Sequence, residues 1–433
     1  MIGFIAFLIS WLMGYYVLRC FKKRDASFEL MDIFLIPGLG LGISAQIIFY
    51  VLLFWGSLAP VLIIQIHLLI LCLLFLYNHR YLPKQSSSFS LSSRSIGVLI
   101  AILAVVALMA TMLALLRPWG DWDGWSFWNY RAHFLFRAGH QWPRLFEFNM
   151  QQQHPWMLPL IILWGWCICG SEERIIPVAI GIIFTVASVG LLIGALKKYV
   201  SFFWAAIGGI FLASIPLFMF QGTSQYADIV AAYFILLSSV LVVDLLRSPS
   251  FNNAALTGLC LGLTASVKDN SIVAVCILLA LSILRLYRSK ASMFIKPLIL
   301  GCVTIGVSVV LMKSFETLNV LNDPYGVSLT GIGDWHKWLL MGRFSLTSLT
   351  SFSWGGLWPL ALAVLIVQRT RWIREEMGVL VQFLIFYIIL YFFIFAASTL
   401  GLEWLLKVSF DRSLFLLAPV VIFTMFYSVG SKE

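Results

Sequence analysis

Two aspartates lie in a stretch where aromatic and charged side chains gather, residues 117–143. The stretch reads "RPWGDWDGWSFWNYRAHFLFRAGHQWP", follows a long apolar segment and contains Asp121, Asp123 and five tryptophans. A carboxylate that aromatic side chains shield from water has a raised proton affinity, as a general base needs, unless a metal ion or a cation keeps it ionised. Asp123 is therefore a candidate base. An aromatic belt at a membrane surface, with acids that face water, is the alternative interpretation.

Three further motifs place ionisable side chains at the ends of apolar segments. "QYADI" contains Asp228, "SVKDNS" contains Lys268 and Asp269, and "FDRS" contains Arg412. A carboxylate near hydrocarbon is costly in free energy, so it usually has a functional role or pairs with a cation. Lys and Arg side chains can bind a phosphate. The structural alternatives are an acid that favours a helix N-terminus, a polar turn, and an arginine that reaches for the membrane surface. His154, which precedes a proline, is either a ligand or a structural histidine.

The composition defines the class of protein. Hydrophobic residues occupy 61% of the 433 positions and charged residues 11%, which is far outside the range of soluble domains. We therefore expect an all-α polytopic membrane protein with one integral domain. The net charge of +10 is spread over short loops, which fits the positive-inside rule and not nucleic-acid binding. The seven cysteines lie in or beside apolar segments without recurrent spacing, as expected of buried side chains and not of disulfides or a zinc site.

Segments of about 20 apolar residues predict thirteen spanning helices. The first, residues 2–19, lacks a positive n-region and a cleavage site, so we expect it to be retained. Basic loops at 22–24, 78–95 and 197–198 agree on one cytoplasmic side, which places the N-terminus and the stretch 117–143 outside and the C-terminus inside. The expected spans are 2–19, 29–56, 59–77, 96–117, 174–196, 201–220, 227–246, 254–269, 271–287, 293–314, 352–368, 378–398 and 413–430.

The expected extracytoplasmic loops are 118–173, 315–351 and 399–412. Within the first loop, "WMLPLIILWGWCIC" at 156–169 is only about two-thirds of a spanning length. We interpret it as a juxtamembrane helix, interfacial or re-entrant, with its tryptophans at headgroup depth. "GLGLG" at 38–42 lies inside an apolar span and predicts close helix packing, not a nucleotide-binding loop.

Five motifs in this order resemble the bacterial membrane glycosyltransferases of the C-type fold, relatives of the protein O-mannosyltransferases and the lipid A aminoarabinose transferases. "WDGWSFWNYRA" at 122–132 is similar to the W-D-x-x-x-x-W-x-x-K-A outer loop of that family, with Arg131 in the lysine position. "HPWMLPLIILWGW" at 154–166 resembles the family's His-Pro and its juxtamembrane helix. "QYADI", "GLTASVKDNS" and "SFDRSLFLLAP" resemble its Tyr-Ala-Asp, its hairpin and its Asp-Arg motif.

The resemblance covers residues 122–417 and has two departures. "HPWM" replaces the family's commoner His-Pro-Asp-Tyr, and "KDNS" lacks the acid that usually follows the asparagine. The resemblance implies a glycosyltransferase-like core over 96–433, with the helices of residues 1–95 outside the shared core.

The resemblance implies an enzyme of the plasma (inner) membrane that moves a sugar from a polyprenyl-phosphate donor to a lipid, glycan or protein acceptor. The transfer would take place on the extracytoplasmic side with inversion at the anomeric carbon. Asp123 would act as the base and Asp228 as the second acid of the site. No cofactor is certain, and a divalent metal held by these two acids is left open. The further substrate-binding candidates are Arg131, His154, Tyr226, Lys268, Asp269 and Arg412.

Two other classes of function remain open at this stage. A transporter or flippase of a lipid-linked solute would favour ionisable groups at mid-bilayer and an inverted repeat. The chain instead gathers its acids at one expected face. A non-catalytic homologue that serves in envelope assembly is the third hypothesis, and the two departures from the family pattern leave it open.

Overall fold

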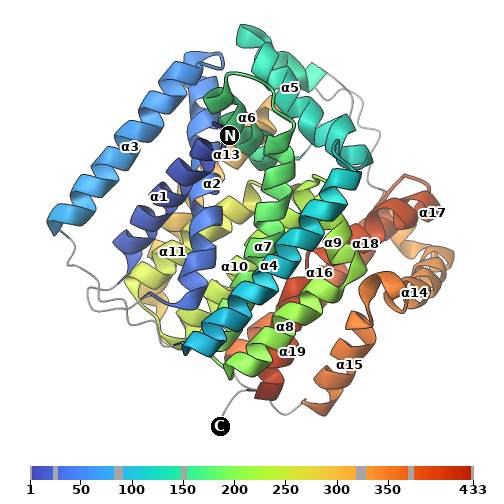
Figure 1. Cartoon of the computed structure of the whole chain (residues 1–433). Coiled ribbons are helices and arrows are strands. Elements are labelled where there is room, and N and C mark those ends of the chain that lie inside the picture. The colour runs from blue at the N-terminus through green and yellow to red at the C-terminus, as the bar shows by residue number, and fades with distance from the viewer. Residues whose placement is uncertain are drawn as a thin grey trace.

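The long apolar runs of the sequence fold as helices, because in lipid each backbone N–H and C=O group must be bonded within its own segment. A computed structural model gives a bundle of helices, and no strand occurs in the part of the chain that it describes (Figure 1). The described residues are 2–22, 28–81, 91–147, 154–317, 328–368 and 375–430.

Within the described ranges, nine helices are long and apolar enough to cross a membrane, or up to eleven if two bent pairs are each one span. Two of the thirteen expected spans are shorter helices, α11 (Phe251–Ala265) and α15 (Leu357–Val367). At 1.5 Å per residue they reach only about 22 Å and about 16 Å, short of a hydrocarbon core of about 30 Å. The nine are α1 (Phe4–Phe21), α2 (Leu30–Trp55), α3 (Pro60–Tyr81), α4 (Ser93–Leu116), α7 (Ile175–Lys197), α10 (Ala227–Arg247), α12 (Asp269–Arg288), α13 (Ile295–Thr317) and α16 (Glu375–Ala397).

Each bent pair has a proline in the first turn after its break. α8 (Phe202–Ser214) and α9 (Pro216–Thr223) meet at 68°, and Pro216 opens α9. The second pair bends by 43° between residues 415 and 418, and Pro419 follows this break. A proline lacks the N–H group that would continue the hydrogen-bond ladder, so each helix restarts in a new direction. The second pair comprises α17 (Leu402–Leu405), a π-helix (Leu406–Phe410), α18 (Asp411–Phe415) and α19 (Ala418–Gly430).

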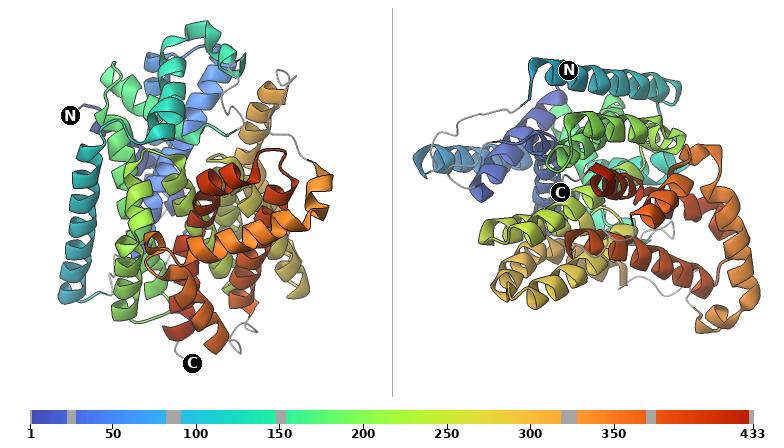
Figure 2. Two further views of the ribbon diagram at one scale, coloured as in Figure 1. Left: turned by 90° about the vertical axis from the view of Figure 1, so that its right-hand side faces the viewer. Right: turned by 90° about the horizontal axis from the view of Figure 1, so that it is seen from below.

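Helix α10 lies at the centre of the bundle. In its most apolar window 89% of the residues are buried, against 11% for α3 and 22% for α4. α3 and α4 accordingly lie at the edges of the bundle in Figures 1 and 2. The N-terminal helices α1 and α2, which the resemblance leaves outside the shared core, pack against α7 and the short helix α6 (Met157–Cys169).

The short helix α6 is an internal part of the protein. The sequence predicts a short apolar helix here, and that expectation is confirmed. Trp156, Trp164 and Trp166 are all at most 1% exposed and thus covered by protein, while their expected headgroup depth stays a prediction. The indole N–H of Trp164 donates to the carbonyl of Ala6 and to the hydroxyl of Ser10 on α1. The helix is therefore held by neighbouring helices and not by lipid headgroups.

The glycine run at 38–42 brings helices together, as the sequence predicts. A Cβ atom added at Gly40 would lie 1.8 Å from the carbonyl oxygen of Ser10, so α1 and α2 approach each other through this position. Small residues permit such close crossings in membrane helix pairs. The packing interpretation of "GLGLG" is confirmed.

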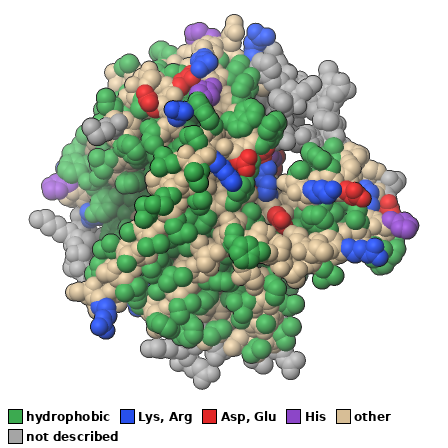
Figure 3. Space-filling view, turned by 45° about the vertical axis from the view of Figure 1, so that its right-hand side comes forward, with side chains coloured by type: hydrophobic (Ala, Val, Ile, Leu, Met, Phe, Trp, Pro, Cys, Tyr) green, Lys and Arg blue, Asp and Glu red, His purple; other side chains and the backbone are tan. Residues whose placement is uncertain are grey.

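The two ends of the bundle differ in chemistry. One end carries the segments that follow α4 and precede α10 and α12, with α5 (Asn129–Arg137) at its tip (Figure 1). On the face in Figure 3, most charged side chains gather in the upper half and hydrophobic side chains dominate below. The opposite end carries Lys22, Lys197, Lys198 and Arg247, which terminate α1, α7 and α10. The described basic residues of the expected cytoplasmic loops thus lie at one end of the bundle, away from the expected site, while residues 23–24 and residues 82–90 of the loop 78–95 lie outside the described residues.

Candidate functional site

The segment after α4 is fastened to the turn between α9 and α10. The N–H of Asp121 donates to the carbonyl of Ser224, and a Cβ atom at Gly124 would lie 2.5 Å from that same oxygen. The side chain of Gln225 accepts from Asn129 at 2.7 Å and donates to the carbonyl of Pro118 at 3.2 Å. These contacts explain why glycine follows Asp123, and they hold that aspartate at the start of the π-helix Gly124–Trp128.

Asp123 is bound from two sides. Its backbone N–H donates to the phenol oxygen of Tyr226 at 3.2 Å, and its carboxylate Oδ2 accepts from Nη1 of Arg412 at 2.5 Å. The guanidinium of Arg412 also lies over the ring of Tyr226, 4.7 Å from its centroid. Burial raises the pKa of Tyr226 to about 12, so the phenol stays neutral at physiological pH. Tyr226 therefore positions both members of this ion pair.

Asp228 is the second residue of α10, in its first turn, and is fully buried. Its Oδ2 accepts from Nη2 of Arg412 at 2.8 Å, and its Oδ1 accepts from Nζ of Lys268 at 2.9 Å. Arg412 thus bridges the two acids that the sequence analysis selected. Asp228 is not among the residues that line the nearby cavity, so its contact is with the cations and not with a ligand. The structure thus places Asp228 behind the two cations and outside the lining of the cavity, and its expected role as second acid stays a prediction.

Lys268 and Arg412 come from elements far apart in the sequence. Lys268 has an extended backbone between α11 and α12 and is 5% exposed. Burial lowers the pKa of Lys268, and the carboxylate of Asp228 opposes that shift. Arg412 follows Asp411, which accepts hydrogen bonds from Ser348 and from the indole N–H of Trp354. Helix α14 (Trp335–Leu349) and the turn after it thereby fix the helix that presents Arg412.

A second group of ionisable side chains lies beside the first. Nδ1 of His154 is 3.1 Å from Oδ2 of Asp269, and Nζ of Lys313 is 2.8 Å from Oδ1 of Asp269. The His154 ring stacks on Trp128 with centroids 5.8 Å apart. Burial lowers the pKa of His154 against the opposing pull of Asp269, so the neutral ring donates its Nδ1–H to that carboxylate.

Arg131 is the one sequence-selected cation that faces away from the cavity. It is 3% exposed, donates to the backbone carbonyl of His154 at 3.0 Å and lies over the ring of Phe127 at 4.0 Å. Neither Arg131 nor Tyr226 lines the cavity. Arg131 therefore supports the segment that carries His154, and a direct phosphate contact does not agree with its position.

A cavity of about 600 Å³ adjoins these side chains, a volume typical of small-molecule sites. Asp123, His154, Lys268, Asp269 and Arg412 form its polar wall. Helix α16 and the segment that includes α17 and the π-helix Leu406–Phe410 supply an apolar part of the lining, which we call the apolar wall. The apolar residues of that wall are Ile394, Phe395, Leu400, Trp404, Leu405 and Val408.

Sequence reasoning missed several residues in and around this cavity. Lys313 lies near the end of a span, where a basic residue usually marks a membrane boundary, so nothing in the sequence connects it to Asp269. The amide of Asn270, adjacent to a selected motif, donates to Ser413 at 3.2 Å and joins the α11–α12 hairpin to α18. The apolar wall has no local signal, because such residues are abundant throughout the chain.

The pair Asp123 and Asp228 does not fit a shared metal ion. Both carboxylates point at one guanidinium, which occupies the space between them. Within the described ranges, no group of three or more His, Cys, Asp or Glu side chains is arranged to hold a metal. The site is instead a chain of alternating charges.

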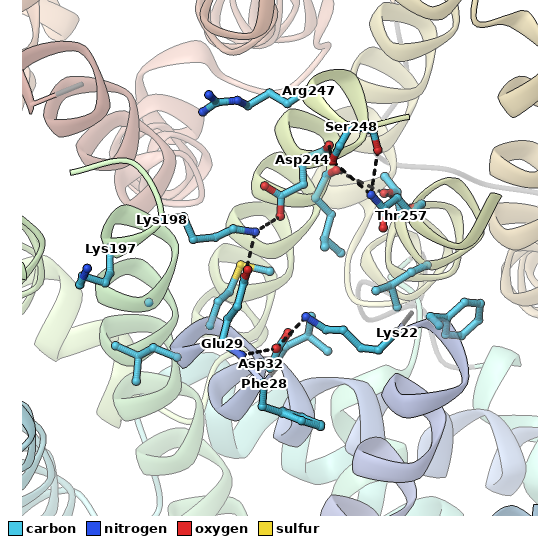
Figure 4. A pocket seen from close by; sticks show the side chains of 18 of the residues that line it. Lys22, Phe28, Glu29, Asp32, Lys197, Lys198, Asp244, Arg247, Ser248 and Thr257 are labelled. Carbon is cyan, nitrogen blue, oxygen red and sulfur yellow. Dashed lines mark hydrogen bonds and ion pairs between the residues drawn. The ribbon is translucent and has the colours of Figure 1, made fainter. Parts of the chain in front are cut away.

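A second cavity of about 750 Å³ lies at the opposite end of the bundle (Figure 4). Lys198 lies between Asp244 at 2.5 Å and Glu29 at 3.1 Å, and Lys22 is 2.7 Å from Asp32. These pairs join the ends of α1, α2, α7 and α10. Each of these carboxylates already contacts an ammonium group, which is typical of a structural network.

The chain matches no protein-family model, no curated protein and no solved structure.

Proposed function

We propose that the protein is an integral membrane glycosyltransferase with a C-type fold that uses a polyprenyl-phosphate sugar as donor. The observation that supports this proposal is the bridge of Arg412 between Asp123 and Asp228 on the wall of the cavity, with Lys268 adjacent. A carboxylate and two cations are the groups that the transfer of a sugar from a phosphate requires.

The reaction would begin when an acceptor hydroxyl or amine enters the cavity beside Asp123. The acceptor oxygen or nitrogen forms a bond to the anomeric carbon, while the bond from that carbon to the phosphate oxygen breaks. The acceptor proton passes to the carboxylate of Asp123, and polyprenyl phosphate leaves with the bonding electron pair. Attack opposite to the leaving group inverts the anomeric centre.

The cations would act on the leaving group. Negative charge grows on the phosphate as its bond to the sugar breaks, and fixed donors in a shielded site stabilise such charge. Lys268 and Arg412 line the cavity and are held by Asp228, which is fully buried. The apolar wall along α16 would provide a surface for the first isoprene units.

The proposed orientation places this end of the bundle outside the cytoplasm. The support is the cluster of Lys22, Lys197, Lys198 and Arg247 at the other end, since cytoplasmic ends carry an excess of Lys and Arg. The acceptor would then be a lipid, glycan or protein that is reached from the extracytoplasmic side of a plasma membrane.

The test is a transfer assay with the purified full-length chain in detergent or nanodiscs. A panel of polyprenyl-phosphate sugars is supplied with candidate acceptors, and released polyprenyl phosphate is measured. Release that depends on Asp123 supports the proposal. A folded protein that releases none from any donor would contradict it, and movement of an intact lipid-linked sugar across vesicles would favour a transporter.

A further inference from the structure

The two acids that share Arg412 are held unequally. Asp228 is fully buried, and its second oxygen is occupied by Lys268 at 2.9 Å. Asp123 lines the cavity, and 17% of its side chain is exposed. A ligand in the cavity therefore reaches the Asp123 side of the guanidinium first. An ion pair near solvent exchanges partners at a lower cost in free energy than a buried one, because water can solvate the charge that is released.

Two donors on this wall have no hydrogen-bond partner within the described residues. They are Nε of Arg412 and the indole Nε1 of Trp128, and both atoms are buried. A buried donor without a partner costs about 1–3 kcal/mol. An acceptor-rich anion of tetrahedral shape, such as a phosphate ester, could satisfy both donors and the guanidinium. A phosphate pairs well with a guanidinium, whose N–H groups form a planar fork.

We propose that the phosphate of the donor replaces Asp123 on Arg412 and thereby releases the catalytic base. Asp228 and Lys268 keep the guanidinium in place during the exchange. The carboxylate of Asp123 is then free of the guanidinium and able to accept the proton of the acceptor. The base is then active only when a donor is bound. Donor binds before acceptor, and the empty site does not deprotonate water or acceptor. This inference rests on the proposed function.

Binding of the phosphate lipid without any sugar tests the exchange. The probe is a polyprenyl monophosphate, titrated into the purified full-length protein and followed by tryptophan fluorescence or calorimetry. Asp123→Asn removes the competitor for Arg412, so the phosphate should bind about tenfold more tightly, as expected for one charge-assisted hydrogen bond. Asp228→Asn should weaken binding, because the guanidinium loses its anchor.

Asp269→Asn is the matched control. It removes the same charge from the same wall, but Asp269 pairs with His154 and Lys313 and not with Arg412. If Asp269→Asn increases the affinity for polyprenyl phosphate as much as Asp123→Asn does, the charge of the wall alone governs binding and not an exchange of partners. The proposal would then fail. In an Arg412→Gln background the gain from Asp123→Asn should vanish. Persistence of the gain there would also overturn the exchange.

Two control ligands distinguish failure of the exchange from failure of the proposed function. The matching polyprenol, which has no phosphate, should bind equally to the wild type and to Asp123→Asn; a gain with the polyprenol would contradict a phosphate-specific exchange. Inorganic phosphate alone should compete only weakly, since it lacks the lipid. Equal competition would contradict a lipid ligand. A folded wild type that binds no polyprenyl phosphate contradicts the proposed function itself. If the wild type binds polyprenyl phosphate but Asp123→Asn does not bind it more tightly, the exchange is contradicted and the proposed function is not.

If Asp123→Asn does not fold, a structure of the wild type with bound polyprenyl phosphate decides the question. A phosphate oxygen should then lie about 3 Å from a guanidinium nitrogen of Arg412, a normal hydrogen-bond distance. Asp123 should have left Arg412, while Asp228 should remain. An Arg412–Asp123 pair that survives phosphate binding would refute the exchange.

Discussion

Nζ of Lys268 lies 2.9 Å from Oδ1 of Asp228, and the two side chains are 7% and 0% exposed. The contact joins the α11–α12 hairpin to the central helix α10. A buried pair of this kind contributes little net stability, but removal of one partner leaves an uncompensated charge. The pair therefore fixes the position of the Lys268 ammonium group at the cavity. A variant that lacks one of the two partners should lose folding stability.

Asp228→Asn should destabilise the protein by about 3 kcal/mol, because Lys268 and Arg412 both lose a buried counter-charge. The measurement is the unfolding midpoint in detergent. The double variant Asp228→Asn with Lys268→Met should recover much of the loss, since an apolar side chain replaces the stranded ammonium. If the single variant is as stable as the wild type, Asp228 is not the anchor that the geometry indicates.

Asp123→Asn should lower the rate of sugar transfer by about 10²–10⁴-fold, the usual contribution of a general base. The protein should still fold, because the carboxylate is partly exposed and its backbone contacts remain. Asp121→Asn is the matched control; its carboxylate lies 4.0 Å from Arg117, outside the Arg412 network, and transfer should be unchanged. A comparable loss in both variants would point to disturbance of the loop.

Stability should fall as the pH decreases below about 6.5, and His154 should account for part of the fall. Burial lowers the pKa of His154 below its unfolded value of 6.5, with Lys268 and Arg131 adding to the shift and Asp269 opposing it. The unfolded chain then takes up a proton that the folded chain does not, so stability is complete above about 6.5 and decreases toward the folded pKa.

His154→Gln isolates this contribution. The amide can still donate to Asp269 but does not titrate, so its unfolding midpoint should vary less between pH 5 and pH 8 than that of the wild type. The other histidines are common to both proteins and cancel in the comparison. Identical pH profiles would show that His154 is protonated in the folded protein as readily as in the unfolded one.

Gly40→Ala should destabilise the protein by about 3 kcal/mol or more, because the new methyl group would meet the carbonyl of Ser10 and force α1 away from α2. Gly97→Ala provides the comparison, since no described atom lies within 4 Å of a Cβ atom at that helical position. It should be neutral or stabilise by about 0.5–1 kcal/mol through helix propensity. Equal midpoints for the two variants would contradict the close α1–α2 crossing.

The sequence predicts the helical bundle well, because apolar length and basic loops are strong local signals. It overestimates the lengths of α11 and α15, because apolar composition alone reveals neither where a helix ends nor whether it packs against protein or faces lipid. The environment of α6 was missed for the same reason. Three tryptophans indicate an amphipathic surface in a sequence, yet the structure buries all three.

The candidate site was predictable in part. Motifs identified Asp123, Asp228, Lys268 and Arg412, and the structure brings these four together. Their pairing was not predictable, because 289 positions separate Asp123 from Arg412 and no local pattern encodes such a contact. The sequence also could not predict that Arg131 donates to the backbone carbonyl of His154, since no local pattern encodes this contact. The catalytic roles remain predictions.

Helix α6 is enclosed by protein, and it receives the segment that carries His154 while its first N–H donates to Ser266 at the α11–α12 hairpin. The segment that carries His154 is thus supported by a helix that is enclosed by protein. Its geometry should be the same in thin and thick bilayers and in detergent. The protein is therefore expected to tolerate changes in membrane thickness and fluidity that would tilt its lipid-facing helices.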